Sequence, residues 1–482
     1  MQSYKMWIGG KWVDASSGKT FGAFNPATGE EIGRVPLADK TDIDKAVEAA
    51  RSASAIWSQK TPAERSDILY KIADAIAAGS NELAELDLIS HGAPIKMAKG
   101  GLMGLPGMFK YAAQASRSFM GQVIPARPDK FFYLQHEPRG VCALIVAWNA
   151  PLVSTSKKLS ACLATGNTCI IKPPSVCSLT VLKLGEILEK VGLPPGTINI
   201  VTGPGGSVGE VLAAHSGINM VSFTGSAETG KRILAVASSS VKKVALELGG
   251  KNPWIVMEDA DIDAAVANSM FQCFANTGMT CASTGRYYLH ENIHEQFIEK
   301  FLVMAKKLVV GDPNDENTFM GPLVSAEHRD KVEGLIKSGV EDGAKLILGG
   351  KRPINPLLEK GYYVSPTIFT GVTQNMRIAR EEIFGPVAVF IKVTSQDNVV
   401  AMANDTNYGL AASIWTKDIP KALRMANELQ TGTVWINGDV IGPPEYPWGG
   451  YKESGFGKEL SILGLEEYIQ TKAICFDITG SK

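Results

Sequence analysis

The segment Val141-Cys-Ala-Leu-Ile-Val-Ala147 is a continuous apolar run in the middle of the chain. Four more largely apolar runs follow it, at residues 168–171, 198–201, 220–223 and 244–248. Helical stretches such as 181–191 and 228–237 lie between these runs. Strands that are apolar on both faces and alternate with helices form parallel sheets that are covered on two sides. The segment and its successors therefore predict an α/β fold.

Polar and glycine residues follow these strands at the edge where their carboxyl ends meet. Lys172 and Ser175 follow the second strand, Gly205 the third, and Gly225 and Ser226 the fourth. Glycines let backbone N–H groups and a helix N-terminus approach a phosphate, so this edge predicts a dinucleotide and a Rossmann-like cofactor domain. The strict GxGxxG fingerprint is missing, and a single glycine after a strand usually marks a turn. The prediction therefore depends on the five loops together.

A second α/β unit is expected from about residue 252 to 430, with strands near 254–257, 287–289, 387–393 and 411–415 and a helix at 295–308. It contains Cys281, whose neighbours Gly278, Thr280 and Ser283 are small or polar and leave room for a substrate. An isolated cysteine is structural more often than catalytic. Glu247 makes a catalytic role for Cys281 more plausible. A carboxylate at the end of an apolar strand costs free energy to bury, so its presence there suggests a function. Both residues point to chemistry in an interdomain cleft.

Composition limits the classes of function that remain. The 482 residues, 45% of them apolar, are enough for two or three domains, and the net charge of -1 gives no basic excess for a nucleic-acid partner. No signal peptide or membrane-length run is present, so we expect a cytoplasmic protein. The seven cysteines lack CxxC spacing and the six histidines lack ligand spacing, so we expect reduced thiols and no metal site.

The chain outside the two units is expected to be helical near its start and extended at two later places. Apolar residues repeat at helical spacing over 43–53, and Thr61 begins a capping box with proline at the first helical position. Residues 125–137 and 473–478 read as extended, apolar segments. The two segments suit either an oligomer contact or sheet edges within one subunit.

Several motifs together resemble the NAD(P)-dependent aldehyde dehydrogenase superfamily over nearly the whole chain. They are Ala147-Trp-Asn149-Ala-Pro151, Thr165-Gly-Asn-Thr-Cys-Ile-Ile-Lys172-Pro, Phe223-Thr-Gly-Ser226-Ala-Glu-Thr-Gly230, Leu246-Glu247-Leu-Gly-Gly-Lys251, the stretch from Phe274 to Arg286, Glu381-Glu-Ile-Phe384-Gly-Pro386, Trp435-Ile-Asn437, and Pro447-Trp448-Gly-Gly-Tyr-Lys-Glu-Ser-Gly455. Their joint order and spacing make the resemblance specific.

The resemblance implies three structural parts and an oligomer. A cofactor-binding domain is expected from residues 1–117 and 139–250 with 433–464, and a catalytic domain from 251–432. An oligomerisation arm is expected from 118–138 and 465–482, which implies a homodimer or a homotetramer.

The resemblance also implies a reaction and the residues that carry it. Cys281 attacks a small-molecule aldehyde, Asn149 and the backbone N–H of Cys281 hold the oxyanion of the thiohemiacetal, and hydride leaves for the nicotinamide. Glu247 then activates the water that hydrolyses the thioester to the acid. Family members that pass the acyl group to coenzyme A typically lack a carboxylate at this position, so hydrolysis is expected.

The resemblance assigns cofactor roles to residues on both units. Lys172 and Ser175 are expected at the adenosine ribose. The other positions are Gly205 beneath the adenine end, Gly225 and Ser226 at the pyrophosphate, Trp148 in the cleft wall, and Glu382 with Phe384 at the nicotinamide ribose and ring. Members that prefer NAD often carry glutamate where this chain has Ser175. Serine removes the repulsion of a 2′-phosphate, so NADP is expected to be accepted alongside NAD.

The expected substrate contacts lie on the helix after Pro151 and beside the cysteine. They are Ala150, Val153, Ser154, Lys157, Thr280 and Trp448. A cation at Lys157 favours a short polar or anionic aldehyde, although a solvated surface lysine fits the pattern equally well. Small Ala150 and aromatic Trp448 favour an aromatic aldehyde instead. A different class, a serine hydrolase with its nucleophile at Ser207, is suggested by Gly205-Gly-Ser207-Val-Gly209, but a turn beneath the cofactor explains this loop better.

Overall fold

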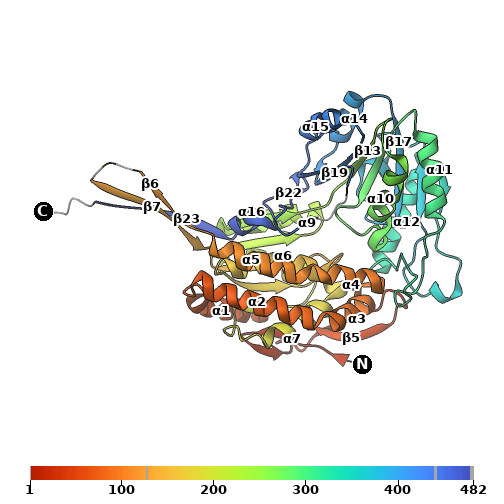
Figure 1. The fold of residues 1–482 in the computed structure, drawn as a ribbon. Coiled ribbons are helices and arrows are strands. Elements are labelled where there is room, and N and C mark those ends of the chain that lie inside the picture. The colour runs from red at the N-terminus through yellow and green to blue at the C-terminus, as the bar shows by residue number, and fades with distance from the viewer. Residues whose placement is uncertain (1, 126, 128, 439–441, 478–482) are drawn as a thin grey trace.

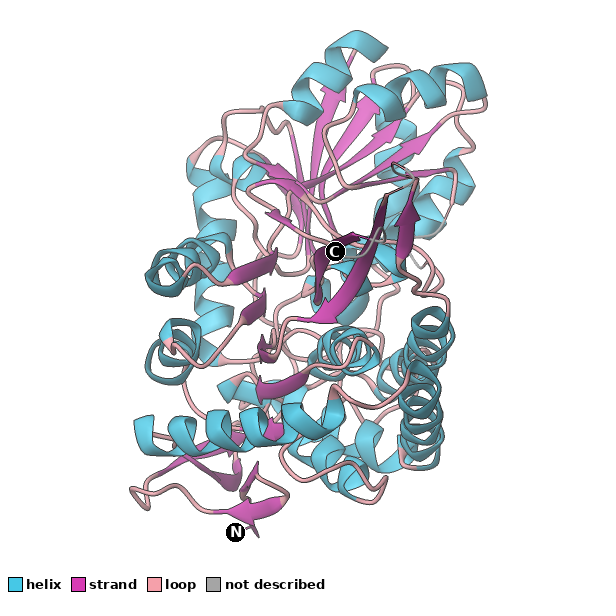
Figure 2. Cartoon of the chain, turned by 90° about the vertical axis from the view of Figure 1, so that its left-hand side faces the viewer, coloured by secondary structure: helices cyan, strands magenta, loops and turns pink. Residues whose placement is uncertain are grey.

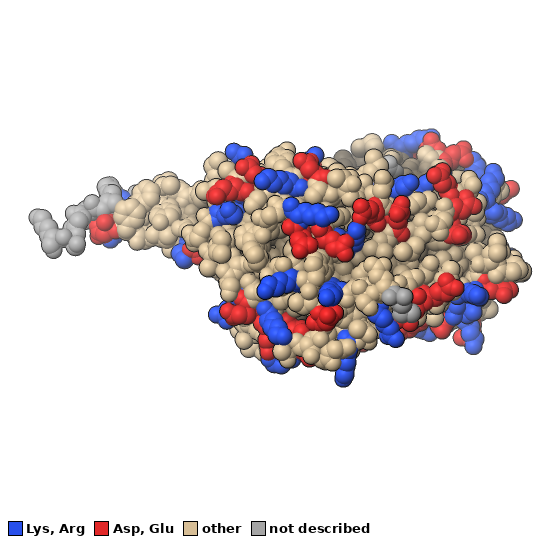
Figure 3. Space-filling view, turned by 90° about the horizontal axis from the view of Figure 1, so that it is seen from below, with Lys and Arg blue, Asp and Glu red and all other residues tan. Residues whose placement is uncertain are grey.

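The structure is a computed structural model that describes residues 2–125, 127, 129–438 and 442–477. Figure 1 shows two α/β bodies, each built around one sheet, and a narrow β-arm that projects away from them. Basic and acidic side chains are interspersed on the face seen in Figure 3. None of the helices in the described ranges combines the length and the apolar character that a membrane crossing requires.

The first sheet contains the five predicted strands in a parallel arrangement. In the order β12, β11, β8, β9, β10 they span Lys243–Glu247, Met220–Thr224, Val141–Ile145, Thr168–Lys172 and Ile198–Ile200. β10 pairs antiparallel with β2 (Met6–Ile8), which pairs with β3 (Lys11–Val13), and β22 (Gly455–Phe456) closes the other edge. The predicted α/β fold is confirmed. The strand order reverses between β8 and β11, and ligands bind at such a point of a parallel sheet.

Helices cover both faces of this sheet. Alternate residues of β8 point to opposite faces, with Cys142 and Leu144 in one buried cluster and Val141, Ala143 and Ile145 in another. The first cluster also contains residues of α2 (Pro62–Ala78), α5 (Leu105–Arg117), α6 (Pro151–Ala164) and α7 (Leu179–Glu189). The second contains residues of α1 (Lys40–Trp57), α8 (Glu210–Ala214) and α9 (Ala227–Ala237). This two-sided burial explains why the strands read as unbroken apolar runs.

The N-terminal part agrees with the predicted helices. The strands β1 (Gln2–Ser3), β4 (Thr20–Phe24) and β5 (Glu31–Pro36) form a small sheet ahead of α1. Capping boxes start α1 at Asp39 and α2 at Thr61. Two more helices follow, α3 (Ser80–His91) and α4 (Ile95–Met103), and α3 ends at Gly92, whose φ of 86° few other residues adopt.

The second sheet has seven strands between helices, as Figure 2 shows in its upper half. Their order is β15 (Lys345–Leu348), β16 (Thr367–Thr370), β17 (Val387–Val393), β14 (Thr284–His290), β13 (Asn252–Val256), β19 (Ala411–Trp415) and β20 (Thr433–Ile436). The main helices are α10 (Ile262–Phe274), α11 (His294–Ala305), α12 (Ala326–Glu341), α14 (Gln396–Asn404) and α15 (Ile419–Glu428). Because β20 pairs in parallel with β19, the boundary predicted at residue 432 is wrong: it cuts through this sheet.

The arm consists of the two segments that were predicted to be extended. β7 (Lys130–Pro138) pairs antiparallel with β23 (Ile469–Asp477) along its whole length, and β6 (Gln122–Ile124) adds a third strand. The predicted end of the last segment, Ile478, lies outside the described residues. A short helix, α16 (Ser461–Glu466), leads into β23.

Candidate active site

A cavity of about 370 Å³ opens at the carboxyl edge of the first sheet, where the second sheet faces it. All eight predicted cofactor residues line this cavity: Trp148, Lys172, Ser175, Gly205, Gly225, Ser226, Glu382 and Phe384. Cys281 and Asn149 line it as well. Residues from both α/β units therefore meet at one cleft, which we call the cofactor cleft.

The end of the cofactor cleft at the first sheet presents cations and helix-start donors. Burial lowers the pKa of Lys172 to about 8, and the side chain makes no ion pair within the described residues. Ser226 caps α9 by accepting a hydrogen bond from the N–H of Thr229 at 3.2 Å. An unpaired buried ammonium and a helix N-terminus both favour an anionic ligand.

The opposite end of the cleft is built around Glu382 and Phe384. The Glu382 carboxylate accepts a hydrogen bond from the Gly250 N–H at 2.8 Å, and burial raises its pKa. A Cβ on Gly249 would stand 2.2 Å from Glu382 Oε2, so a larger residue there would displace the Glu382 carboxylate. Phe384 has a φ of 57° and packs edge-on against Trp148 with ring centroids 5.1 Å apart.

Among the ionisable residues that line the cleft, the sequence did not predict His328 or Lys331. His328 and Lys331 on α12 line the cleft, and the His328 ring packs on Trp148 and lies 2.7 Å from the carbonyl oxygen of Phe384. Burial lowers the pKa of His328 to about 4, so the ring is neutral at pH 7 and donates to that carbonyl. Neither residue belongs to a motif, so no sequence pattern could have indicated them.

The loop before Cys281 has an unusual backbone. Asn276, Thr277 and Gly278 are consecutive left-handed residues with φ of 50°, 56° and 73°. For the two residues with a Cβ, this conformation costs on the order of 1–2 kcal/mol each. Asn276 offsets the strain by donating from Nδ2 to the carbonyl of Asn149 at 2.8 Å, which ties the loop to the other catalytic candidate.

A second side-chain amide holds Cys281 itself. Asn252 Nδ2 donates to the carbonyl oxygens of Cys281 and Ser283 at 2.8 and 2.9 Å. The thiol is half-buried, and burial raises its pKa to about 12, with Glu247 adding to the rise and Lys157 opposing it. A neutral thiol is thus the resting form without ligands. Asn252 directly follows the motif that ends at Lys251, and the sequence does not predict its positioning role.

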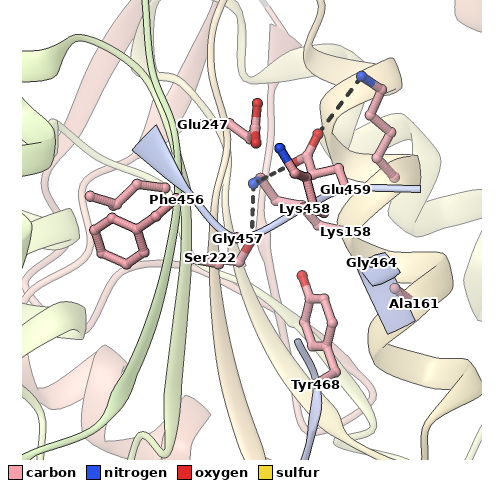
Figure 4. A pocket seen from close by; sticks show the side chains of 13 residues that line it. Lys158, Ala161, Ser222, Glu247, Phe456, Gly457, Lys458, Glu459, Gly464 and Tyr468 are labelled. Atoms are coloured by element: carbon pink, nitrogen blue, oxygen red, sulfur yellow. Dashed lines mark hydrogen bonds and ion pairs between the residues drawn. The ribbon is translucent and has the colours of Figure 1, made fainter. Parts of the chain in front are cut away.

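Glu247 ends β12 as predicted and points into a small space beside a charged cluster (Figure 4). Its Oε1 has no hydrogen-bond partner among the described residues, and its side chain is buried. Burial and the neighbouring Glu459 raise its pKa well above the usual value, while the ammonium groups of Lys157, Lys158 and Lys458 oppose the rise. The result is a carboxyl group that binds a proton more readily than a solvated glutamate does.

Glu459 balances the cations of this cluster. Lys158 is buried and donates to Glu459 Oε1 at 2.6 Å and to Ser222 Oγ at 3.0 Å (Figure 4). Lys157 Nζ lies 3.7 Å from Glu459 Oε2. Burial of Glu459 favours its protonation, but Lys158 and Lys157 outweigh it and lower the pKa of Glu459. The Glu459 carboxylate therefore stays charged beside Glu247.

The expectation of an unpaired cation at Lys157 is wrong. Lys157 is committed to Glu459, and its ammonium lies 5.5 Å from the ring centroid of Trp448, which stacks on Trp435. Ser154, on the same helix, is buried and its hydroxyl has no partner within the described part of the chain. Neither alternative from the sequence holds for Lys157, which is neither a free anion receptor nor a fully solvated side chain.

A second cavity, of about 270 Å³, lies on the other side of Asn149. We call it the aldehyde cavity, because three of the predicted substrate residues line it: Ala150, Val153 and Thr280. Ser154, Lys157 and Trp448 are not among its lining residues. Its walls come from α3, α4, α6 and α10 and are mostly apolar, with Met97, Leu102 and Phe271 among them. Asn149 lines both cavities. Thr280 lines the aldehyde cavity, and its neighbour in sequence, Cys281, lines the cofactor cleft.

The serine hydrolase alternative receives no support from the geometry. Ser207 is exposed on a π-helical turn, Gly205–Gly209, and not at a strand-to-helix elbow. His215, the histidine nearest to it in the sequence, lies 3.2 Å from Asp44 and accepts a hydrogen bond from the N–H of Gly217. No hydrogen bond between Ser207 and a histidine occurs in the described residues.

Comparisons with known proteins agree with this geometry. The model of the aldehyde dehydrogenase family matches residues 12–474. The chain is 42% identical over 475 residues to a betaine aldehyde dehydrogenase of Bacillus subtilis, covering 98% of this chain and 97% of the relative. It is 41% identical over 479 residues to retinal dehydrogenase 2 of Homo sapiens, covering 98% and 92%.

Solved structures extend the likeness to three dimensions. A betaine aldehyde dehydrogenase from Staphylococcus aureus in complex with NAD+ superposes with a TM-score of 0.98 at 37% identity, over 100% of this chain and 96% of the other. PnpE from Pseudomonas sp. WBC-3 superposes with a TM-score of 0.97 at 38% identity, over 99% and 98%.

Proposed function

Because this chain belongs to the aldehyde dehydrogenase family, we propose that it oxidises its aldehyde to a carboxylic acid through a covalent intermediate on Cys281, with NAD or NADP as hydride acceptor. The family assignment confirms the resemblance read from the motifs. One observation supports the mechanism above all others: Cys281 and Asn149 line the same cleft as the eight candidate cofactor residues.

The cleft residues fit a dinucleotide. Lys172 is a buried ammonium without an acidic partner in the described residues, and Gly249 leaves no room for a Cβ beside Glu382. Lys172, Ser175 and Ser226 would hold the adenosine and phosphate groups, and Glu382 with Phe384 the nicotinamide half. The nicotinamide, when bound, supplies a hydride acceptor. Everything else in the reaction falls to the protein's own side chains.

In the first step the sulfur of Cys281 bonds to the aldehyde carbon. Burial raises the pKa of the thiol to about 12, so the thiol is neutral at rest and passes its proton to water in the cleft as the bond forms. The new oxyanion is held by the side-chain amide of Asn149 and the backbone N–H of Cys281, each contributing roughly 3 kcal/mol to the transition state. Asn252 and Asn276 fix the loop on which this geometry depends.

In the second step water hydrolyses the thioester that hydride loss leaves on Cys281. Glu247 is suited to take the proton from this water, because burial and Glu459 raise its pKa. The water oxygen bonds to the acyl carbon, the carbon–sulfur bond breaks, and the sulfur recovers a proton. A carboxyl group at this position favours hydrolysis over transfer to another thiol.

The acceptance of NADP stays a prediction. Ser175 carries no charge that would repel a 2′-phosphate, and both Lys172 and Lys331 line the cleft. The solved relative from Staphylococcus aureus contains NAD+, which supports NAD as a second acceptor here. We therefore propose use of both.

For the substrate we propose a polar, uncharged aldehyde. The aldehyde cavity is lined by apolar residues and a few polar ones, and no lysine or arginine is among the described residues that line it. Asp87 in its wall would repel an anion. An aromatic aldehyde is the second candidate, because Ala150 and the apolar walls leave space for a ring.

The projecting arm supports a homodimer or a homotetramer. Val123, Ile124, Phe131 and Phe476 on the arm are all exposed apolar residues, with 65%, 44%, 37% and 48% of their surface accessible. A second subunit that packs against the arm would bury this apolar surface. The three-part division, which the resemblance implies, and the cytoplasmic location, which the sequence pattern favours, both remain predictions.

The proposed mechanism is tested by measuring reduced cofactor at 340 nm over an aldehyde panel with NAD and NADP in turn. Cys281→Ser should abolish turnover, whereas Ser207→Ala on the exposed turn should leave kcat/KM unchanged. Turnover by Cys281→Ser together with its loss in Ser207→Ala would reverse the assignment.

A further inference from the structure

Two polar side chains in the wall of the aldehyde cavity make no hydrogen bond within the described part of the chain and have no role in the chemistry described so far. Asp87 and His91 lie one turn apart on α3, and both line the cavity that also contains Asn149, Ala150 and Thr280. They belong to no motif. In sequence they read as an ordinary helix end.

His91 is buried, Asp87 is partly buried, and both side chains have unsatisfied polar atoms. Only 2% of the His91 side chain and 14% of the Asp87 side chain are accessible. Among the described residues, Asp87 Oδ1 and both ring nitrogens of His91 lack a hydrogen-bond partner. The 3.9 Å between His91 Nδ1 and Asp87 Oδ2 is too long for a hydrogen bond. Buried polar groups are nearly always paired, so these atoms call for a ligand or ordered water in the cavity.

The backbone at the end of α3, which carries His91, packs closely against two prolines. Gly92 follows His91 with a φ of 86°, and its N–H donates to the Leu88 carbonyl. A Cβ at Gly92 would lie 2.7 Å from Pro322 and 2.9 Å from Pro26. The backbone that carries His91 is therefore fixed against two prolines.

We propose that Asp87 and His91 form a polar subsite for a hydroxyl group carried on the body of an otherwise apolar aldehyde. The subsite rests on the proposed function, because it needs an aldehyde in this cavity. A carboxyl oxygen accepts a hydrogen bond and an imidazole N–H donates one. A hydroxyl group is the substituent that can donate to the first and accept from the second.

The protonation of the two groups is consistent with a neutral guest. Burial raises the pKa of Asp87 to about 7 and lowers the pKa of His91 to about 4. His91 is therefore neutral at pH 7, and Asp87 is partly protonated. A hydroxyl can bond to either form of the carboxyl group, because it both donates and accepts.

A cationic substituent fits less well. An ammonium group could approach Asp87, but it offers no acceptor and would leave the imidazole N–H unsatisfied. A quaternary ammonium could hydrogen-bond to neither group. The cavity also lacks an aromatic cage, since Phe271 is the single aromatic residue among its described lining residues.

The test compares hydroxylated aldehydes with methyl analogues of the same shape. The probes are 2-, 3- and 4-hydroxybenzaldehyde with the corresponding methylbenzaldehydes, and one aldehyde that carries a quaternary ammonium group. In the wild-type enzyme, kcat/KM should favour at least one hydroxyl isomer over its methyl analogue by roughly 10- to 100-fold, because the methyl analogue leaves the subsite unpaired.

The variants Asp87→Asn and His91→Leu should each remove most of this preference. They should lower kcat/KM for the favoured hydroxyl isomer while changing the methyl analogue by less than about 3-fold. His91→Gln, which keeps a donor, should restore part of the preference. Glu85→Gln, on the exposed face of the same helix, is the matched control and should change nothing. Melting curves and binding of reduced cofactor confirm that each variant is folded.

Three outcomes overturn the subsite. The first is a wild type that does not distinguish hydroxyl from methyl at any position, which leaves only water on Asp87 and His91. The second is a variant in which kcat/KM falls by the same factor for the hydroxyl isomer and for its methyl analogue. The third is a loss confined to the quaternary ammonium aldehyde in Asp87→Asn, which assigns a cation site instead. In all three the methyl analogue is still oxidised through Cys281, so the proposed function stands; if no aldehyde is oxidised, the proposed function fails and the subsite with it.

Discussion

Replacing Glu247 with glutamine separates the two halves of the proposed reaction. The side chain is 6% exposed and its Oε1 has no partner in the described residues, so an amide of the same shape fits without breaking a contact. Hydride loss from the adduct on Cys281 does not require the carboxyl group. We therefore expect the first turnover to proceed and the hydrolysis of the thioester to stall.

The magnitude follows from the role assigned to the carboxyl group. A positioned general base contributes about 10²- to 10⁴-fold, so kcat of Glu247→Gln should fall by roughly 10³-fold, or about 4 kcal/mol of barrier. Stability should not fall. The pKa of Glu247 is higher in the folded protein than in the unfolded chain. Ionisation of Glu247 therefore lowers the free energy of unfolding, and this loss grows as the pH rises from the unfolded pKa to the folded pKa. A neutral glutamine avoids this loss of stability at pH 7.

The assay is rapid mixing with detection of reduced cofactor at 340 nm, followed by intact-protein mass spectrometry. Glu247→Gln should give a burst of about one equivalent per active site and then a slow phase, and an acylated Cys281 should accumulate. Glu466→Gln, an exposed residue at the end of α16, is the matched control. A steady-state rate within about 5-fold of wild type, or the loss of the burst itself, would show that Glu247 is not the base for hydrolysis.

Three further predictions concern the thiol, the cofactor and the arm. Since burial raises the pKa of Cys281 to about 12, alkylation by iodoacetamide without cofactor should speed up about tenfold per pH unit from 7 to 10, and a plateau below pH 9 would contradict this. Since burial lowers the pKa of Lys172 to about 8, the side chain loses its charge above that pH. In the wild type, the ratio of kcat/KM for NADP to kcat/KM for NAD should therefore fall several-fold from pH 7 to 9. In Lys172→Met the same ratio should stay constant over this pH range. Phe131→Asp on the arm should yield monomers by light scattering at an unchanged melting temperature, and a monomeric wild type would disprove the arm's role.

The parts of the site that sequence could predict are those in which local pattern and chemistry coincide. Apolar runs located the five central strands of the first sheet and four of the seven strands of the second. The carboxylate at the end of one run indicated Glu247. Asn149 follows β8 at the edge where the parallel strands of the first sheet end. Cys281 lies in the loop before β14 of the second unit, and it lines the same cleft because the two units face each other. The boundary at residue 432 was wrong because β20 is defined by its pairing with β19, which no local signal records.

The parts that sequence could not predict depend on residues that are far apart in the chain or that no sequence motif marks. Lys158 and Glu459 are 301 residues apart, and each alone reads as a surface charge. Asp87 and His91 are close in sequence, but their burial is decided by α4, α6 and α10 packing around the same cavity. His328 and Lys331 reach the cofactor cleft only because α12 approaches it from the second unit.

The reassignment of Lys157 changes what the charged cluster does. A lysine at the mouth of a tunnel would select an anionic substrate, whereas a lysine bound to Glu459 helps to set the proton affinity of Glu247. Three ammonium groups, from Lys157, Lys158 and Lys458, lower the pKa of Glu247 against burial and Glu459, which raise it. If Glu459 were neutral, the cations would hold Glu247 ionised and weaken it as a base. The cluster therefore serves the hydrolysis step, and substrate selection passes to the walls of the aldehyde cavity.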